Sequence, residues 1–230
     1  ERYNEDALAD IKATIGSYFW NALYMGQPSS KEGGILKRNW WQYWTVIPGQ
    51  DAEHPHGQFD SVIQSWDMTF KDAQGSDFVV GQVWGKKGSG RYLLDQVRDR
   101  MDIVATIRAL KSLSAKWPEA RGKIVEDSAN GPAIITLLKH EVEGMIAWSA
   151  KGSKESRVQA IQPLLEAGNV YIPSSASWLN DFVEECSAFP NGAHDDQVDA
   201  MSQALLRLGR TGQVAISYSP FYGTMEEEPF

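Results

Sequence analysis

The sequence predicts an α/β fold in which helices cover both faces of a mixed β-sheet. Three strand-like runs at 61–70, 77–85 and 91–100 are joined by short turns, which is typical of an antiparallel meander. After this meander, helical and strand patterns alternate as far as residue 208. Such alternation favours further parallel strands packed between helices.

The elements before the meander are a helix and an aromatic segment. Residues 5–24 place apolar side chains at helical spacing, and the breaker-rich GQPSSKEGG follows them. Residues 35–47 are aromatic and strand-prone, and PGQDAEHPHG then interrupts regular structure. We therefore place the start of the compact domain near Gln58.

The elements after the meander follow in the order expected of an α/β domain. Asp102 can cap a helix that ends near Trp117. A short strand at 123–127 precedes a helix that begins near Pro132. The remaining patterns predict strands at 145–150 and 169–173, and helices at 155–168, 178–186 and 194–210. Residues 211–230 lack a helical period and carry an acidic run, so we expect a loosely attached tail.

Composition excludes several classes of protein. The chain has 230 residues, 42% of them hydrophobic, and nine Trp, which excludes a disordered chain. Its single cysteine, Cys186, argues against a disulfide or zinc framework and favours a reducing compartment. No apolar run of about 18 residues and no signal peptide occur, so we expect a soluble protein without a membrane partner. Because the chain begins with Glu1, we treat it as a piece of a longer protein.

Net charge limits the partners that the chain can bind. A net charge of −8 argues against a protein coated in basic charge for non-specific nucleic-acid binding. It leaves room for a local basic groove beside an acidic site.

Carboxylates stand at the ends of predicted elements. They are Asp67 after the first meander strand, Glu126 and Asp127 after the next parallel strand, and Asp195, Asp196 and Asp199 at the start of the last helix. In open α/β sheets, sites lie at strand ends, so these three sources can converge. Converging carboxylates repel one another unless cations neutralise them. Oxygen ligands suit Mg²⁺ or Mn²⁺, and two such ions about 3.5–4 Å apart can promote hydrolysis of a phosphodiester.

Each acidic motif also has an ordinary structural interpretation. Asp67 can be a turn residue, Glu126 and Asp127 can begin the SANG turn, and the last group can be first-turn acids that favour the helix dipole. Adjacent residues of a strand point to opposite faces, so only one of Glu126 and Asp127 is expected to reach a metal. Asp196 is preferred over Asp195 because it shares a helical face with Asp199. The order and strand-end placement of all three motifs favour a metal site.

The motifs SWDMTF, IVEDSANGPAI and HDDQVDAMSQAL together resemble those of the nuclease domain of the large terminase subunit of tailed bacteriophages. This domain has a ribonuclease H-like fold related to Holliday-junction resolvases. The upstream ALYMGQPSSKEGGILKRNWWQYW resembles the junction that follows the packaging ATPase domain, and the resemblance covers most of residues 18–208. It implies a linker region at 1–57 after a missing ATPase domain, a nuclease domain at 58–210 and a tail at 211–230.

The resemblance also implies an activity. Asp67, Glu126 and Asp196 match the family's catalytic acids, with Asp199 as a further acid, and Glu126 is preferred over Asp127 because SANG follows it at the family's spacing. The expected function is two-metal cleavage of concatemeric double-stranded DNA in the host cell cytoplasm, with little sequence specificity. The expected partners are the portal protein and the small terminase subunit, and the piece alone is expected to be monomeric. Without a GxxxxGK[ST] motif, it is not expected to hydrolyse ATP. The alternatives are a junction resolvase and a docking module that is active only in the assembled motor.

Two basic groups are candidates for contact with DNA phosphates. The first lies in 81–100 and contains Lys86, Lys87 and Arg91, followed by Arg98 and Arg100. The second, in a Gly/Ser-rich loop and the helix after it, contains Lys151, Lys154 and Arg157. Phosphate contacts position a duplex without reading its sequence. The alternative is that both groups are solvated surface cations.

Overall fold

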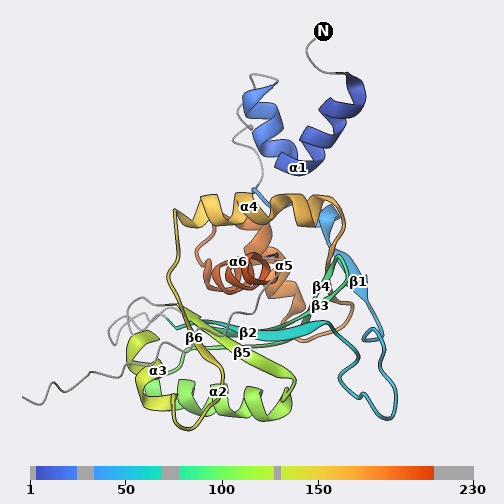
Figure 1. Cartoon of the computed structure of the whole chain (residues 1–230). Coiled ribbons are helices and arrows are strands. Elements are labelled where there is room, and N and C mark those ends of the chain that lie inside the picture. Colours follow the sequence, from blue (N-terminus) through green and yellow to red (C-terminus); the bar gives the residue numbers. More distant parts are fainter. Residues whose placement is uncertain (1–3, 25–33, 69–77, 127–130, 210–230) are drawn as a thin grey trace, which may run out of the picture.

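A mixed seven-stranded sheet lies between two layers of helices in the computed structural model (Figure 1). The structure describes residues 4–24, 34–68, 78–126 and 131–209. The strands are β1 (Gln42–Trp44), β2 (Ser61–Asp67), β3 (Val79–Lys87), β4 (Gly90–Asp99), β5 (Ala120–Glu126), β6 (Met145–Trp148) and β7 (Val170–Pro173). The helices are α1 (Glu5–Leu23), α2 (Ile103–Lys116), α3 (Gly131–Leu138), α4 (Lys154–Glu166), α5 (Leu179–Ala188) and α6 (Asp196–Gly209), with a short 3₁₀ helix at Arg38–Trp40.

The strand order is β1-β7-β4-β3-β2-β5-β6. Strands β2, β3 and β4 pair antiparallel and form the predicted meander. On one side of it, β5 and β6 add parallel to β2, and on the other side β7 and β1 add parallel to β4. The predicted mixed sheet is therefore confirmed.

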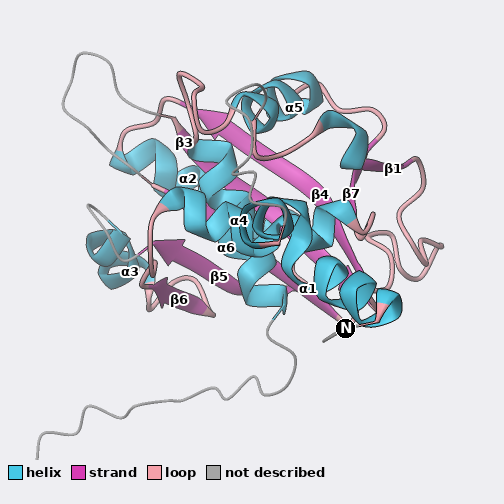
Figure 2. Cartoon of the chain, turned by 90° about the horizontal axis from the view of Figure 1, so that it is seen from above, coloured by secondary structure: helices cyan, strands magenta, loops and turns pink. Residues whose placement is uncertain are grey.

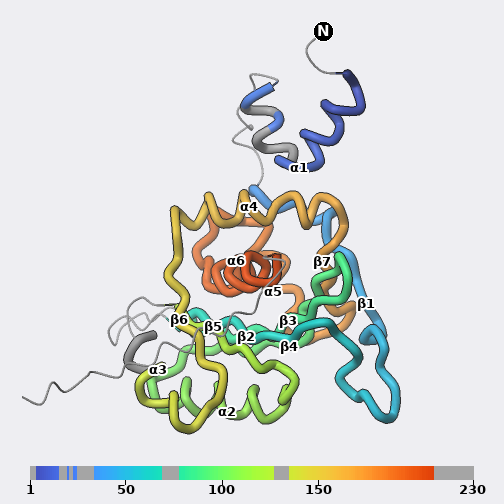
Figure 3. Tube along the Cα trace, in the orientation of Figure 1, coloured from blue at the N-terminus to red at the C-terminus, as the bar shows by residue number. Residues whose placement is uncertain are grey.

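Helices α4, α5 and α6 cover one face of the sheet, and α2 and α3 cover the other (Figure 1). Apolar residues alternate between the faces, so that Ile63 and Ile124 join the core under α4–α6, whereas Trp66 and Val125 join the core over α2 and α3. The predicted placement of helices on both faces is confirmed. Helix α6 lies in the middle of its layer, with α4 outside it (Figures 2 and 3).

Local signals set the ends of several helices. The side chain of Asp102 accepts a hydrogen bond from the backbone N–H of Ala105, which confirms the predicted cap of α2. Ser153 caps α4 in the same way through the N–H of Ser156. Gly168 follows α4 with φ +71°, a left-handed conformation that glycine adopts at low cost.

The structure differs from the sequence-based expectations at three places. Only a small part of the strand-prone segment 35–47 is a strand, because a 3₁₀ helix precedes the short strand β1. β3 continues to Lys87, so Lys86 and Lys87 are strand residues that pair with β4. β1 also joins the sheet, and Leu36 and Trp41 are buried in its core, N-terminal to Gln58. The domain boundaries stay a prediction, and the tail at 211–230 lies outside the described residues.

Helix α6 is more deeply buried than its sequence suggests. The sequence places Asp196 and Asp199 on one helical face, but every residue from Asp196 to Leu205 is buried, on all sides of the helix. Helix α6 is buried because it lies between the sheet and α4, which covers the side of α6 that faces away from the sheet (Figure 3). Among the described residues, no helix has the length and apolar character needed to cross a membrane.

Candidate functional site

Two of the predicted acids lie at the ends of neighbouring parallel strands. In the register of β2 and β5, Trp66 is opposite Val125, so Asp67 and Glu126 come next on their strands. Strand alternation places Asp67 on the same face as Ser65, whose hydroxyl donates to the carbonyl of Ala200 in α6 at 2.7 Å. Asp67 is only 5% exposed, so this carboxyl group is held beneath α6.

The other acids come from the start of α6. Asp196 and Asp199 are both 5% exposed and occupy the first turn of the helix. Asp195 precedes the helix and is more exposed. The macrodipole favours negative charge at this end of a helix, which lowers the cost of ionising buried carboxyl groups.

Two cations of α4 contact these carboxylates. Lys154 Nζ lies 2.7 Å from Asp195 Oδ1 and 2.6 Å from Asp199 Oδ2. Arg157 donates to Asp199 Oδ1 at 2.8 Å, and its other terminal nitrogen lies 3.8 Å from Glu126 Oε1. Helix α4 thus links the end of β5 to the start of α6 through side-chain charge.

The charge state of Lys154 follows from these contacts. Burial acts to lower its pKa, but the hydrogen bonds to Asp195 and Asp199 outweigh burial and raise the pKa above the ordinary lysine value. Lys154 is therefore charged at neutral pH and offsets part of the repulsion among the acids.

The donor set has the chemistry that a divalent metal requires. Carboxylate oxygens are hard ligands of the kind that Mg²⁺ and Mn²⁺ prefer. Within the described part of the chain, no three His, Cys, Asp or Glu side chains already surround a common point where an ion could sit. Asp127 lies outside the described residues. The acids fit a metal by their residue type and their common location. In the structure, Lys154 and Arg157 contact several of the carboxylate oxygens that would otherwise bind the ion.

Comparison with known proteins assigns this arrangement to a family. A family described as the terminase RNaseH-like domain matches residues 64–208, which contain Asp67, Glu126 and the acids of α6. The chain belongs to this family. The resemblance inferred from the three acidic motifs is therefore confirmed. No curated protein matches the chain.

Solved terminase structures share the fold of this terminase domain. The large terminase of the thermophilic bacteriophage D6E is 13% identical, with a TM-score of 0.64, and the match covers 90% of this chain and 53% of that one. The large terminase nuclease of thermophilic phage G20c with bound magnesium is 16% identical, with a TM-score of 0.59, and the match covers 77% and 99%. The zinc-bound G20c nuclease is 18% identical, with a TM-score of 0.56, over 74% and 95%. The terminase domain thus spans about half of the D6E protein.

A buried amide network fixes α6 on the sheet and was not predicted from the sequence. Gln96 Nε2 donates to Gln197 Oε1 at 2.7 Å, and Gln82 Nε2 donates to Gln96 Oε1 at 2.8 Å and to the carbonyl of Gln197 at 3.1 Å. Gln197 in turn donates to both carboxylate oxygens of Glu185 on α5. Gln203 reaches Ser65 and the carbonyl of Ile124. The available signal was a glutamine within each of the apolar runs 77–85 and 91–100, where Gln82 and Gln96 lie.

The first basic group lies away from the acids. In the antiparallel register Lys86 is opposite Ser61, whereas Asp67 is opposite Val80, so Lys86 and Lys87 lie at the far end of the terminase sheet. Arg91 is 5% exposed and donates to the carbonyls of Gly88, Ser89, Gly90 and, on α6, Leu208. Burial lowers the pKa of Arg91. Through these hydrogen bonds Arg91 connects the turn between β3 and β4 to the end of α6.

Two later cations of the same run lie at the acidic end of the terminase sheet. Arg98 is opposite Val80, the partner of Asp67. Its guanidinium carbon lies 3.7 Å from the ring centre of Phe78, and that of Arg100 lies 5.1 Å from it. Phe78 also makes an edge-on contact with His194, which precedes the acids of α6. Of the second group, Lys154 and Arg157 contact the acids, and Lys151 lies in the exposed loop before α4.

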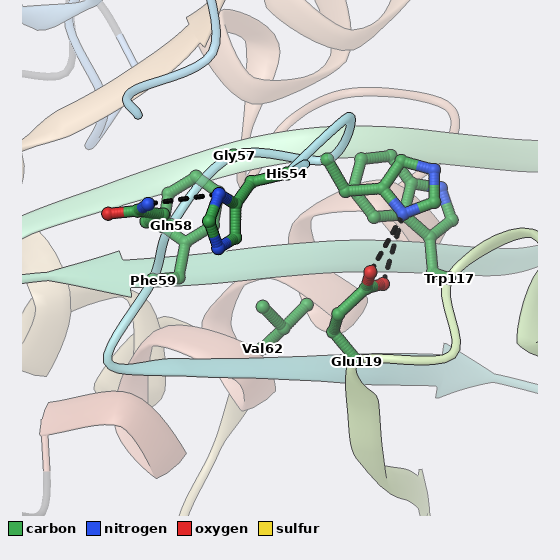
Figure 4. A pocket seen from close by; sticks show the side chains of 8 residues that line it. His54, Gly57, Gln58, Phe59, Val62, Trp117 and Glu119 are labelled. Atoms are coloured by element: carbon green, nitrogen blue, oxygen red, sulfur yellow. Dashed lines mark hydrogen bonds and ion pairs between the residues drawn. The ribbon is translucent and has the colours of Figure 1, made fainter. Parts of the chain in front are cut away.

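A hollow of about 490 Å³ lies at the opposite end of β2 (Figure 4). His56 Nδ1 is 3.0 Å from Glu119 Oε2, and the His56 ring lies 4.6 Å from the ring of Trp117. On the other side of the hollow, the Gln58 side chain contacts His54. These groups tie the loop before β2 to the start of β5 and are about 20 Å, one strand length, from Asp67. They take no part in the acidic cluster, by which we mean Asp67, Glu126, Asp195, Asp196 and Asp199.

Proposed function

We propose that this terminase domain is a divalent-metal-dependent endonuclease that cuts concatemeric double-stranded DNA during viral genome packaging. The observation that carries the proposal is the convergence of Asp67, Glu126 and the acids of α6 at one edge of the sheet. Membership of the terminase RNaseH-like family supports it. The G20c nuclease has been solved with magnesium, zinc and cobalt, which supports a divalent ion at an equivalent place here.

In this proposal Asp67, Glu126 and Asp196 hold Mg²⁺ or Mn²⁺, with Asp199 close by. When held by these residues, two divalent ions would supply activation of water and stabilisation of the leaving oxygen of a phosphodiester. The chain contributes rigidity, because β2 and β5 fix Asp67 and Glu126, and the amide network fixes the height of α6 above the sheet. Arg157 orients Asp199 through the contact at 2.8 Å.

We infer the biological setting from the same observations. Double-stranded DNA is the substrate, and the portal protein and small terminase subunit are the proposed partners in the host cell cytoplasm. The chain spans about half of the D6E large terminase. Partner binding and DNA translocation are therefore proposed for a longer protein that contains this domain. Because its cations do not form a base-reading motif, the domain is proposed to cut with little sequence preference.

Conversion of supercoiled plasmid to nicked and linear forms tests the proposal. Wild type is compared with Asp67→Asn in Mg²⁺, Mn²⁺ and EDTA. Asp67→Asn should reduce cutting by about 100-fold or more, because a neutral amide is a weaker metal ligand and several kcal/mol of charge stabilisation is lost.

Asp60→Asn is the matched control, because Asp60 precedes the other end of β2 and accepts a hydrogen bond from Gly88. It should cut as wild type does. Equal cutting by wild type and Asp67→Asn, with both folded by circular dichroism, would contradict the proposed function.

A further inference from the structure

A second hollow, of about 200 Å³, lies beside the acidic cluster between β6, α4 and α6. The side chains that line it include Trp148, Ser149, Lys151, Ser156, Arg157 and Leu206. Ser149 and Lys151 belong to the exposed loop that joins β6 to α4. Trp148 is also opposite Glu126 in the register of β5 and β6, so the hollow lies next to one of the acids.

The lining combines groups that recognise a phosphate. Lys151 and Arg157 supply positive charge, and the hydroxyl of Ser149 supplies a further donor. The first turn of α4 adds the positive end of a 13-residue helix, capped by Ser153. Trp148 and Leu206 add apolar surface to the lining, which suits a sugar or base.

Arg157 is the buried cation of the hollow. The residue is 8% exposed, so an anion in the hollow meets its guanidinium away from bulk water. Attraction between opposite charges is stronger there than at an exposed lysine, because less water screens it.

The position of Arg157 also relates the hollow to the acids. Its terminal nitrogens contact Asp199 and Glu126, so the same side chain borders both regions. Leu206 follows Asp199 by seven residues on one face of α6, which is two turns or about 10 Å.

We propose that this hollow, the α4 pocket, binds a backbone phosphate of the DNA strand close to the bond that is cut. The proposal rests on the proposed nuclease function for its choice of ligand. Lys151 and Arg157 hold the phosphate oxygens, and Trp148 contacts the adjoining deoxyribose. The α4 pocket thereby positions the strand beside Asp67, Glu126 and the acids of α6.

Binding of a fluorescent DNA duplex in EDTA, followed by anisotropy at several salt concentrations, tests the α4 pocket without any cutting. Lys151→Ala should weaken binding about three- to tenfold at low salt and reduce the slope of log K against log salt by about one. Ser149→Asp should weaken binding at least as much, because it places a negative charge in the pocket. Both residues are exposed, so the folded state should be retained.

Lys139→Ala is the matched control, because Lys139 is an exposed lysine just after α3 on the other face of the sheet. It should bind within twofold of wild type. Unchanged binding by Lys151→Ala and Ser149→Asp, or equal weakening by Lys139→Ala, would overturn the proposal. Calorimetry with inorganic phosphate separates the two possible sources of the anion. Phosphate binding that depends on Lys151 while duplex binding does not would also overturn the assignment to DNA.

The experiments distinguish a failure of the proposed nuclease function from a failure of the proposed α4 pocket. If Asp67→Asn still cuts plasmid, the nuclease assignment fails, whatever the duplex measurements give. If Asp67→Asn abolishes cutting but the pocket variants bind normally, the nuclease assignment stands and the α4 pocket is wrong.

Discussion

The two ends of β2 carry ion pairs of very different character. At the acidic end, the side chains of Arg157 and Asp199 are 9% and 4% exposed, whereas at the other end those of His56 and Glu119 are 30% and 46% exposed. Exposed pairs contribute about 0–1 kcal/mol, and a buried pair loses hydration that its mutual attraction only partly restores. A fold gains little stability by burying such a pair. The buried charges at one end therefore indicate function, and the exposed pairs at the other indicate attachment of a loop.

Removal of one buried partner should give the largest effect. Arg157→Met leaves Asp199 beside fewer compensating charges and should lower the free energy of unfolding by about 3–5 kcal/mol in EDTA. Urea denaturation measures the loss. The control is Arg38→Met, which breaks an exposed pair with Glu184 and should cost less than about 1 kcal/mol. Similar losses in the two variants would remove the distinction between the two kinds of ion pair.

Loss of the amide network should give an intermediate effect. Gln197→Leu retains bulk but removes the acceptor of Gln96 Nε2 and the side-chain donor to Glu185 Oε2, which should cost about 2–3 kcal/mol. Thermal unfolding compares it with Gln50→Leu, in which an exposed hydrogen bond to the carbonyl of Pro55 is lost. The control should change stability by less than about 0.5 kcal/mol. A Gln197→Leu protein as stable as the control would show that the network does not hold α6.

The smallest effect should come from Asp51 in the loop before β2. The side-chain hydrogen bond with His54, helped by the backbone N–H of His54, lowers the pKa of Asp51. A lowered pKa in the folded state contributes stability above the ordinary Asp value of about 3.9, and that contribution is lost as pH falls through the lowered pKa. The Tm difference between wild type and Asp51→Asn should therefore be small near neutral pH and disappear in acid. A difference that grows in acid would contradict this assignment.

The sequence was sufficient to predict the order of the elements and the strand-end position of the acids. Asp67 and Glu126 end runs whose apolar pattern identifies strands, and parallel pairing then brings those ends together. The contacts of Lys154 and Arg157 with the acids were not predictable, because a cation in a Gly/Ser-rich stretch has the same local pattern whether it contacts DNA, solvent or a buried carboxylate. The role of Gln197 was hidden for a similar reason, since its partners lie 101 and 12 positions away in the chain.

The late position of α6 in the chain has a consequence during synthesis. Translation releases about 5–20 residues per second, so β2 and β5 leave the ribosome several seconds before Asp196 and Asp199. Until then the nascent polypeptide carries Asp67 and Glu126 without the acids of α6, and the proposed metal site is incomplete. A chain of this design can complete the proposed metal site only when its last described helix has docked, so a partly made chain would lack the proposed activity.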